Sequence, residues 1–173
     1  MSASQSAPAP SRRVRAIFEG GGDGWELLTR ARLLERAGVP VVNLTIGEHE
    51  NPTPPRIVEA MAASARAGNT RYAPVAGTHA LRAALAARSA ARTGAPCTPE
   101  EVVVTIGGQM ALFYAFMACT DPGEAAVIVD PFYATYPGTL RAAGAEVRVA
   151  PALPDAGFQP DLPALERACT GAR

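Results

Sequence analysis

The chain has 173 residues, a length that suits one domain of ordinary size, and 48% of the residues are apolar, which is typical of a globular protein. The formal net charge is zero, so the charge indicates neither nucleic acid nor an anionic membrane surface as a partner. No run approaches the roughly 18 apolar residues of a membrane helix. The first segment, Met1 to Ser11, is polar and Pro-rich with no apolar core, which is unlike a signal peptide.

Lysine is absent from the sequence, and all 16 basic residues are arginine. Codon preference for Ala and Arg is the simplest explanation, but every reaction that needs a lysine amine is still closed to this chain. The 3 cysteines are odd in number and far apart, with no CxxC pair, so we expect neither zinc nor a disulfide framework. Buried free thiols in a reducing, cytoplasmic environment are the predicted state of Cys97, Cys119 and Cys169.

Hydrophobic periodicity and turn residues predict alternating helices and strands behind a flexible tail that extends from Met1 to about Arg13. Such alternation is typical of βαβ units with a parallel sheet, and the strands are apolar throughout, as strands covered on both faces should be. The predicted helices are Trp25–Ala37, Ile57–Ala67, Thr78–Arg92, Gly107–Cys119, Tyr133–Ala143 and Leu162–Ala168, with one capped turn at Thr98–Glu101. The predicted strands are Val41–Ile46, Val102–Thr105, Ala126–Val129 and Glu146–Val149.

The first candidate site follows the strand Val102–Thr105, where Ile106-Gly107-Gly108-Gln109 leads into a helix. Two glycines let the backbone turn sharply with its N–H groups outward, and a helix N-terminus adds partial positive charge. Together these features can hold a phosphate without a cationic side chain. A simple tight turn is the alternative interpretation, and the segment is neither GxGxxG nor a Walker loop.

The second candidate is the segment from Asp130 to Pro137, at the C-terminal end of a predicted parallel strand, where α/β proteins bind ligands. Its aromatic residues, Phe132, Tyr133 and Tyr136, could form a stacking wall for a flat ring. Core packing beneath the sheet is the alternative.

Two loops, Ile46–Pro54 and Gly68–Gly77, are rich in turn residues, and the second leads to Leu81-Arg82. His49, flanked by two glutamates, could belong to a metal site. A solvated polar loop is the better interpretation, because adjacent residues seldom point at one centre. We therefore expect no metal.

In order and spacing, these four segments resemble the class I/II aminotransferases of the pyridoxal-phosphate fold type I group. The family pattern I-G-E-x-x-x-x-T-P matches Ile46 to Pro54, and Y-x-P-x-x-G-x-x-x-L-R matches Tyr72 to Arg82. The pattern V-T-x-G-G-x-x-A-L matches Val104 to Leu112. D-P-G-[DE] followed by a strand and P-x-[YFW]-x-x-Y matches Asp121 to Glu124 and Pro131 to Tyr136. The resemblance covers about Trp25 to the end of the chain.

The resemblance implies pyridoxal 5'-phosphate as cofactor, with Gly107, Gly108 and Gln109 binding its phosphate through backbone and side-chain donors. It implies that Tyr133 stacks on the pyridine ring and that Tyr72 reaches the phosphate of the neighbouring subunit of a homodimer. Gly47 would approach the substrate carboxylate through its N–H. The full-length activity would move an amino group between an amino acid and a 2-oxo acid.

By the same resemblance, an Asn-Pro-x-x-Pro turn should follow Thr170–Arg173, with the pyridinium Asp, the Schiff-base Lys and the substrate-binding Arg further on. None is in this sequence, so we expect no catalysis by this chain alone. The expected fold is α/β: a tail (1–13), an N-terminal segment (14–75) and the first part of a three-layer α/β/α cofactor domain (76–173). Exposed sheet edges and apolar faces should make the isolated chain aggregate.

Three other interpretations stay open: one half of a split enzyme with a lysine-bearing partner, a non-catalytic module that binds the cofactor or a partner, and an unrelated Rossmann-type domain. The last predicts GxGxxG and a later acidic residue, and both are absent. Thr45–His49 and Gly68–Thr70 weakly resemble an arginine–pyruvate aminotransferase subgroup. Substrate choice, however, depends largely on residues that the chain lacks.

Overall fold

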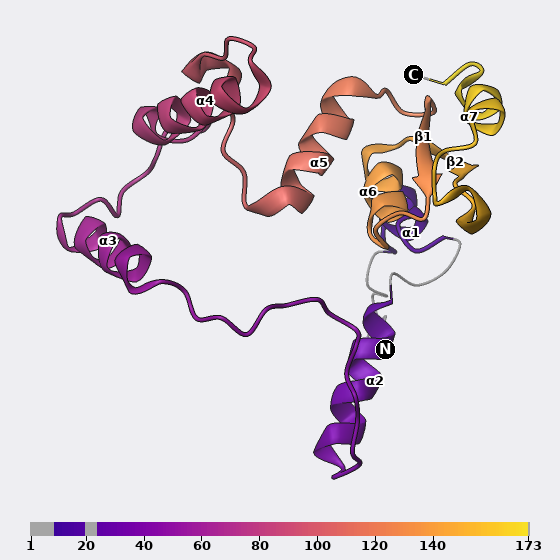
Figure 1. Ribbon diagram of the computed structural model, residues 1–173, viewed down its shortest axis with the longest axis horizontal. Helices are drawn as coiled ribbons and strands as arrows, with labels where there is room; N and C mark the ends of the chain where they lie inside the picture. Colours follow the sequence, from indigo (N-terminus) through magenta and orange to yellow (C-terminus); the bar gives the residue numbers. More distant parts are fainter. Residues whose placement is uncertain (1–8, 20–23, 173) are drawn as a thin grey trace, which may run out of the picture. The chain divides into compact units, whose positions relative to one another are not determined.

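The computed structural model describes residues 9–19 and 24–172 (Figure 1). The described chain divides into two compact units: residues 47–108, and the preceding segment up to Ile46 together with Gln109 onward. In chain order the elements are α1 (Arg12–Ala16), α2 (Trp25–Arg36), α3 (Pro55–Arg66), α4 (His79–Thr93), η1 (Pro99–Glu101), α5 (Gly107–Cys119), β1 (Ala125–Asp130), α6 (Tyr136–Ala143), β2 (Glu146–Pro151), η2 (Pro154–Ala156) and α7 (Leu162–Cys169).

The core of the unit that contains Gln109 onward is a β1–α6–β2 crossover. The two strands pair in parallel, from Ala125 opposite Glu146 to Asp130 opposite Pro151, and α6 connects them. Small residues allow this close packing, and Leu140 of α6 is the largest fully buried side chain in the described residues. The other buried residues of this region are Ala125, Thr139, Ala143, Ala145, Ala150 and Ala152.

The crossover closes at Gly144, directly after α6. Its φ of +96° lies in the left-handed region, which ends the helix. A Cβ atom there would lie 3.3 Å from Cα of Pro122, and the Gly144 carbonyl accepts a 2.9 Å bond from the N–H of Gly123. The Asp-Pro-Gly turn before β1 and the glycine before β2 are therefore fixed to each other.

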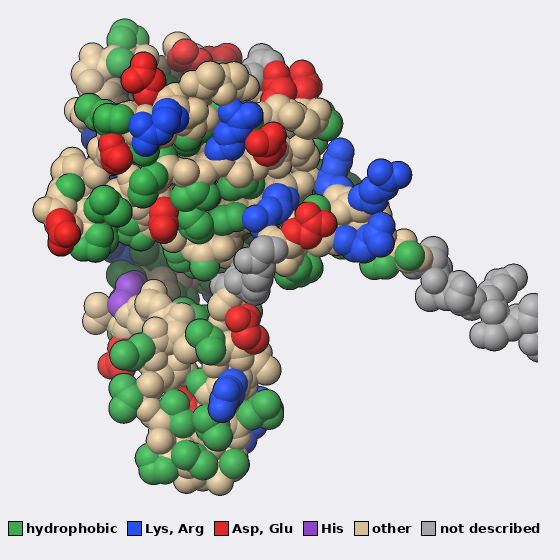
Figure 2. Space-filling model, turned by 90° about the vertical axis from the view of Figure 1, so that its right-hand side faces the viewer, with side chains coloured by type: hydrophobic (Ala, Val, Ile, Leu, Met, Phe, Trp, Pro, Cys, Tyr) green, Lys and Arg blue, Asp and Glu red, His purple; other side chains and the backbone are tan. Residues whose placement is uncertain are grey.

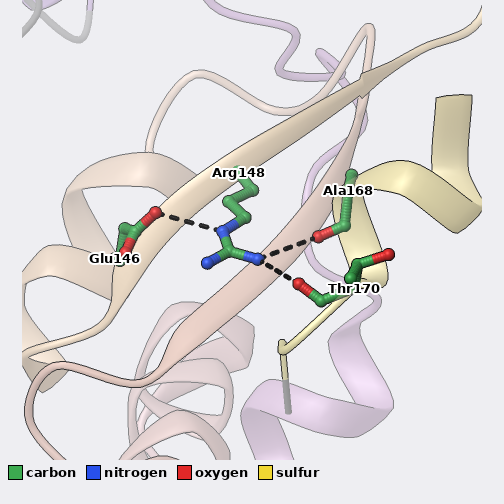
Figure 3. A network of polar contacts seen from close by, with 4 residues as sticks. All are labelled: Glu146, Arg148, Ala168 and Thr170. Atoms are coloured by element: carbon green, nitrogen blue, oxygen red, sulfur yellow. Dashed lines mark hydrogen bonds and ion pairs between the residues drawn. The ribbon is translucent and has the colours of Figure 1, made fainter.

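Arg148 of β2 ties the end of α7 to the sheet (Figure 3). Its NH1 donates to the carbonyls of Thr170 (2.7 Å) and Ala168 (3.4 Å), and its Nε donates to Glu146 at 3.0 Å. These carbonyls have no partner within the helix, because the last turn of a helix leaves its C=O groups unpaired. The guanidinium therefore acts as the C-terminal cap of α7.

Helix α1 was not predicted and starts inside the segment interpreted as a flexible tail. The hydroxyl of Ser11 accepts from the N–H of Val14 at 3.3 Å, which is N-capping. The helix packs on α6, and a Cβ at Gly138 would meet the Ile17 carbonyl at 3.2 Å. Residues 1–8 of the predicted tail lie outside the described residues.

Residues 47–108 consist of helices and extended loops. Helix α3 starts with Pro55 at its first position, and α4 stops at Gly94, whose φ is +74°. The predicted capping box at Thr98 is present: its N–H donates to Glu101 at 2.7 Å, and its side chain accepts from the Glu101 backbone. Of these residues only Ala86 is buried.

The predicted helices and the strands β1 and β2 are confirmed, although α6 starts at Tyr136 and not at Tyr133. Two predicted strands are wrong. Val41–Ile46 carries no strand, because the Asn43 side chain bonds the N–H and hydroxyl of Thr45 and also reaches Glu35 of α2. Val102–Thr105 has no strand assignment either, since no strand among the described residues pairs with it.

Two predictions of burial are also wrong. β1 and β2 form a sheet of two strands, so their side chains are mostly half-buried and not covered on both faces. The thiols of Cys119 and Cys169 are exposed, and that of Cys97 is half-buried.

Large apolar side chains are exposed in both units, and Figure 2 shows hydrophobic groups on the surface that it draws. Helix α5 is apolar on all sides, yet none of its residues is buried. A helix that is hydrophobic all round is typical of the interior of a larger protein. The exposed large apolar side chains of the two units include Leu27 and Leu33 of α2, Ile57 and Met61 of α3, and Tyr114 and Met117 of α5.

Candidate functional site

The N-terminus of α5 carries the predicted phosphate-binding glycines. The N–H of Gly107 donates to the Thr105 carbonyl at 3.0 Å, and the Thr105 hydroxyl donates to the Gly107 carbonyl at 3.0 Å. The φ of Gly107 is +77°, a conformation that side chains with a Cβ rarely adopt. A Cβ on Gly107 or Gly108 would meet nothing within 4 Å. The turn leads directly into α5, and the first turn of a helix leaves backbone N–H groups without a partner inside the helix.

The segment before this turn is held by residues 76–82. The N–H of Val104 donates to the Ala76 carbonyl at 2.9 Å, and Nε of Arg82 donates to the Val102 carbonyl at 2.9 Å. Gly77 has a φ of +100°, and a Cβ there would lie 2.6 Å from Cγ2 of Val104. The glycine and arginine of the Y-x-P-x-x-G-x-x-x-L-R segment thus fix the extended backbone that enters the glycine turn.

The predicted aromatic wall starts one turn before α6. The rings of Tyr133 and Tyr136 are 5.7 Å apart and inclined at 54°, and the N–H of Tyr136 donates to the Tyr133 carbonyl at 2.9 Å. The Tyr133 side chain is 62% exposed, so one face of its ring is available for stacking. The core-packing alternative does not describe Tyr133.

The amide of Gln109 joins α5 to this aromatic segment. Its Oε1 accepts from the Thr135 hydroxyl at 2.8 Å, and its Nε2 donates to the hydroxyl of Thr139. The Thr139 hydroxyl in turn donates to the Thr135 carbonyl at 2.8 Å. We did not predict a role for either threonine. Their i, i+4 spacing at the start of a helix was the available signal, because it places two hydroxyls on one helix face.

Gly47 and Tyr72 lie in residues 47–108, on exposed backbone outside helices and strands. The Tyr72 side chain is fully exposed, and a Cβ at Gly47 would meet nothing within 4 Å. Within its own unit the structure brings Gln109 together with the segment of Tyr133. Gly107 and Gly108 belong to the same helix as Gln109.

The pKa of Glu101, in the capped turn that precedes Val102, is lowered. The N–H of Thr98, and after it the Thr98 side chain, hydrogen-bonds the carboxylate and holds the pKa of Glu101 below its ordinary value. This acid stabilises the turn that precedes Val102.

Within residues 9–19 and 24–172, no group of three or more His, Cys, Asp and Glu side chains is placed to hold a metal ion. In the same part of the chain, no helix is both long and apolar enough to cross a membrane. His49 and its neighbouring glutamates lie in exposed loop.

Comparison with known proteins gives a consistent result. The family model described as aminotransferase class I and II matches residues 39–173. The aspartate/prephenate aminotransferase of Thermus thermophilus is 40% identical over 162 residues, which are 92% of this chain and 41% of that protein. An arginine–pyruvate transaminase of Pseudomonas aeruginosa is 36% identical over 84% of this chain and 37% of its own length.

Among solved structures, the aspartate aminotransferase from Thermus thermophilus with maleate superposes with a TM-score of 0.85 at 39% identity. The match covers 94% of this chain and 42% of that one. The chain therefore spans about two fifths of the length of these relatives.

Proposed function

Because the chain belongs to the class I and II aminotransferase family, we propose that it supplies the cofactor-phosphate end of a pyridoxal-phosphate site and does not transfer amino groups alone. The predicted family and α/β fold class are confirmed by the sequence and structural relatives. The glycine turn at the start of α5, inside the matched segment, is the observation that carries the proposal.

The described residues fit the phosphate and the ring of this cofactor. Gly107 and Gly108 have no side chain, and a Cβ added at either would meet nothing within 4 Å, so neither would hinder a phosphate at the N-terminus of α5, where the helix dipole favours an anion. Tyr133 offers an exposed ring for stacking. Tyr72, exposed within residues 47–108, suits contact with a second subunit of a homodimer.

The chemistry of transfer needs more than this chain contains. When bound, pyridoxal phosphate supplies an electron sink for the substrate α-carbon. The chain's residues would hold the phosphate by N–H groups at the start of α5, Tyr133 would cover one face of the ring, and the Gly47 N–H would be a donor for a substrate carboxylate. No lysine is present to take up the α-proton, and arginine cannot replace it because a guanidinium stays protonated.

The proposed substrate class is an amino acid with a 2-oxo acid acceptor. The names of the relatives cover an acidic and a basic amino acid, so the proposal is confined to the chemistry that they share. Cytoplasmic localisation and the domain division between residues 75 and 76 remain predictions.

Binding of pyridoxal 5'-phosphate and of pyridoxal to the full chain, measured by equilibrium dialysis, tests the proposal. The N-terminal amine should be acetylated, because it is the one remaining primary amine. We expect tighter binding of the phosphorylated form. Gly108→Asp should lower the affinity for pyridoxal 5'-phosphate at least about tenfold through charge repulsion. The control Gly94→Asp, on an open turn of residues 47–108, should not lower it.

Borohydride treatment and an aminotransfer assay separate the alternatives. We expect the cofactor to stay dissociable and the chain mass unchanged, with transfer no faster than with the free cofactor. Equal binding of pyridoxal and its phosphate would overturn the proposed site. Transfer that appears with a copurifying lysine-bearing polypeptide would favour the split enzyme.

A further inference from the structure

Gln109 sits in a closed set of hydrogen bonds with two threonines of the α6 region. Its amide oxygen accepts from Thr135 and its amide nitrogen donates to Thr139, while the Thr139 hydroxyl donates to the Thr135 carbonyl. Thr139 is only 7% exposed. A buried hydroxyl needs a partner, so removal of one member leaves another unsatisfied.

The set connects α5 to the residue that would cover the ring. Thr135 directly precedes α6, whose first residue, Tyr136, bonds the Tyr133 carbonyl and contacts its ring. A shift of the Thr135–Thr139 turn relative to α5 would therefore move Tyr133. An amide suits this bridge because it offers an acceptor and a donor at once.

We propose that Gln109 is a positioning residue: its side chain ties the start of α5 to α6 and so fixes Tyr133, with Thr139 as its obligatory partner. The relevance to a cofactor rests on the proposed function above. The contribution of this side chain to affinity passes through the ring, and the phosphate is held by backbone N–H groups.

Three ligands separate this role from direct phosphate contact: pyridoxal 5'-phosphate, pyridoxal and inorganic phosphate. In the full chain, Gln109→Leu and Thr139→Val should each weaken binding of both ring-bearing ligands about threefold to tenfold, as expected for one lost hydrogen bond. The double variant should be no weaker than the worse single variant, because both changes break one bridge. Binding of inorganic phosphate should not change.

Thr29→Val is the matched control. Thr29 of α2 makes the same type of bond to the carbonyl four residues before it, at 3.1 Å to Trp25, but has no bond to α5. The opposite pattern would overturn the proposal. In that pattern Gln109→Leu weakens binding of inorganic phosphate and of pyridoxal 5'-phosphate but leaves binding of pyridoxal unchanged, and Thr139→Val has no effect on any of the three.

A second measurement needs no cofactor. The sequence has 3 glutamines (Gln5, Gln109 and Gln159), so Gln109→Leu assigns the Gln109 side-chain amide in a ¹⁵N spectrum of the full chain. Thr139→Val should shift this signal and speed its exchange with water, Thr29→Val should do neither, and Gln109→Leu should shift the Tyr133 ring signals. A Gln109 signal indifferent to Thr139→Val would overturn the bridge. Absence of cofactor binding alongside the expected shifts would reject the proposed function and leave the bridge standing.

Discussion

Two regions of the chain are built from similar elements but stabilised differently. Residues 125–151 form a paired βαβ crossover around Leu140 and several buried alanines. Residues 47–108 have longer helices, yet they bury only Ala86 and leave Ile57 and Met61 of α3 exposed. Their order depends on bonds within each helix, the Thr98 capping box, and the contacts of Gly77 and Arg82. The first region finds its apolar partners locally in the sequence, whereas the second does not.

The largest test of this comparison is Leu140→Ala. Deletion of this side chain from a packed site should lower the free energy of unfolding of the crossover by about 2–5 kcal/mol. The measurement is hydrogen exchange of the β1 amides. Leu162→Ala, at a 70% exposed position of α7, should change it by less than about 0.5 kcal/mol. Equal effects of the two changes would mean that the crossover has no real core.

Gly77→Ala tests the contact that orders the entry to the glycine turn. The new Cβ would collide with Val104, so we expect a loss of about 1–3 kcal/mol in the opening free energy of residues 98–106. Gly94→Ala has a similar positive φ and open space, so it reports the backbone cost alone, about 1 kcal/mol. Val104→Ala should recover part of the loss in Gly77→Ala. If both glycines respond alike, the close approach is unimportant.

Arg148→Met removes the C-terminal cap of α7 while keeping much of the stem. The side chain is 32% exposed, so the expected loss is modest, about 1 kcal/mol, and confined to exchange of the α7 amides. Arg32→Met, at an exposed position of α2, is the control and should leave the exchange of the α7 amides unchanged. A response of the β1 amides as large as that of α7 would show that Arg148 supports the sheet itself.

The smallest effect concerns pH. The folded-state pKa of Glu101 is lowered. Its carboxylate therefore stabilises the capped turn at pH values above the ordinary pKa of 4.5, and this stabilisation is lost as the pH falls through the lower folded-state pKa. Exchange of residues 98–102 should therefore quicken on acidification below that range. Glu101→Gln should remove this acid dependence, and Glu100→Gln should keep it. Identical acid profiles for wild type and Glu101→Gln would contradict the capping role.

The α-helices from α2 to α7 could be predicted, because their signals are local: hydrophobic periodicity, Pro55 at a helix start and Gly94 at a helix end. The 5-residue α1 was missed. Strands could be predicted only where the partner is nearby, as with β1 and β2, 21 residues apart in register. Val102–Thr105 is extended but unpaired, and β-propensity cannot supply a partner. At the site, the glycine turn and Tyr133 came from motif spacing. The bridge from Gln109 to Thr139 did not, because it depends on contacts across 30 residues.

The packing of α1 on α6 also sets an order of folding. The crossover joins segments close in sequence, so it can form soon after residue 151 has left the ribosome. Helix α1 has 5 residues, too few to be stable alone, and its docking surface at Gly138 is made more than 100 residues later. We therefore expect α1 to become ordered after the crossover on which it packs. Until the crossover has formed, α1 would stay accessible to chaperones and proteases.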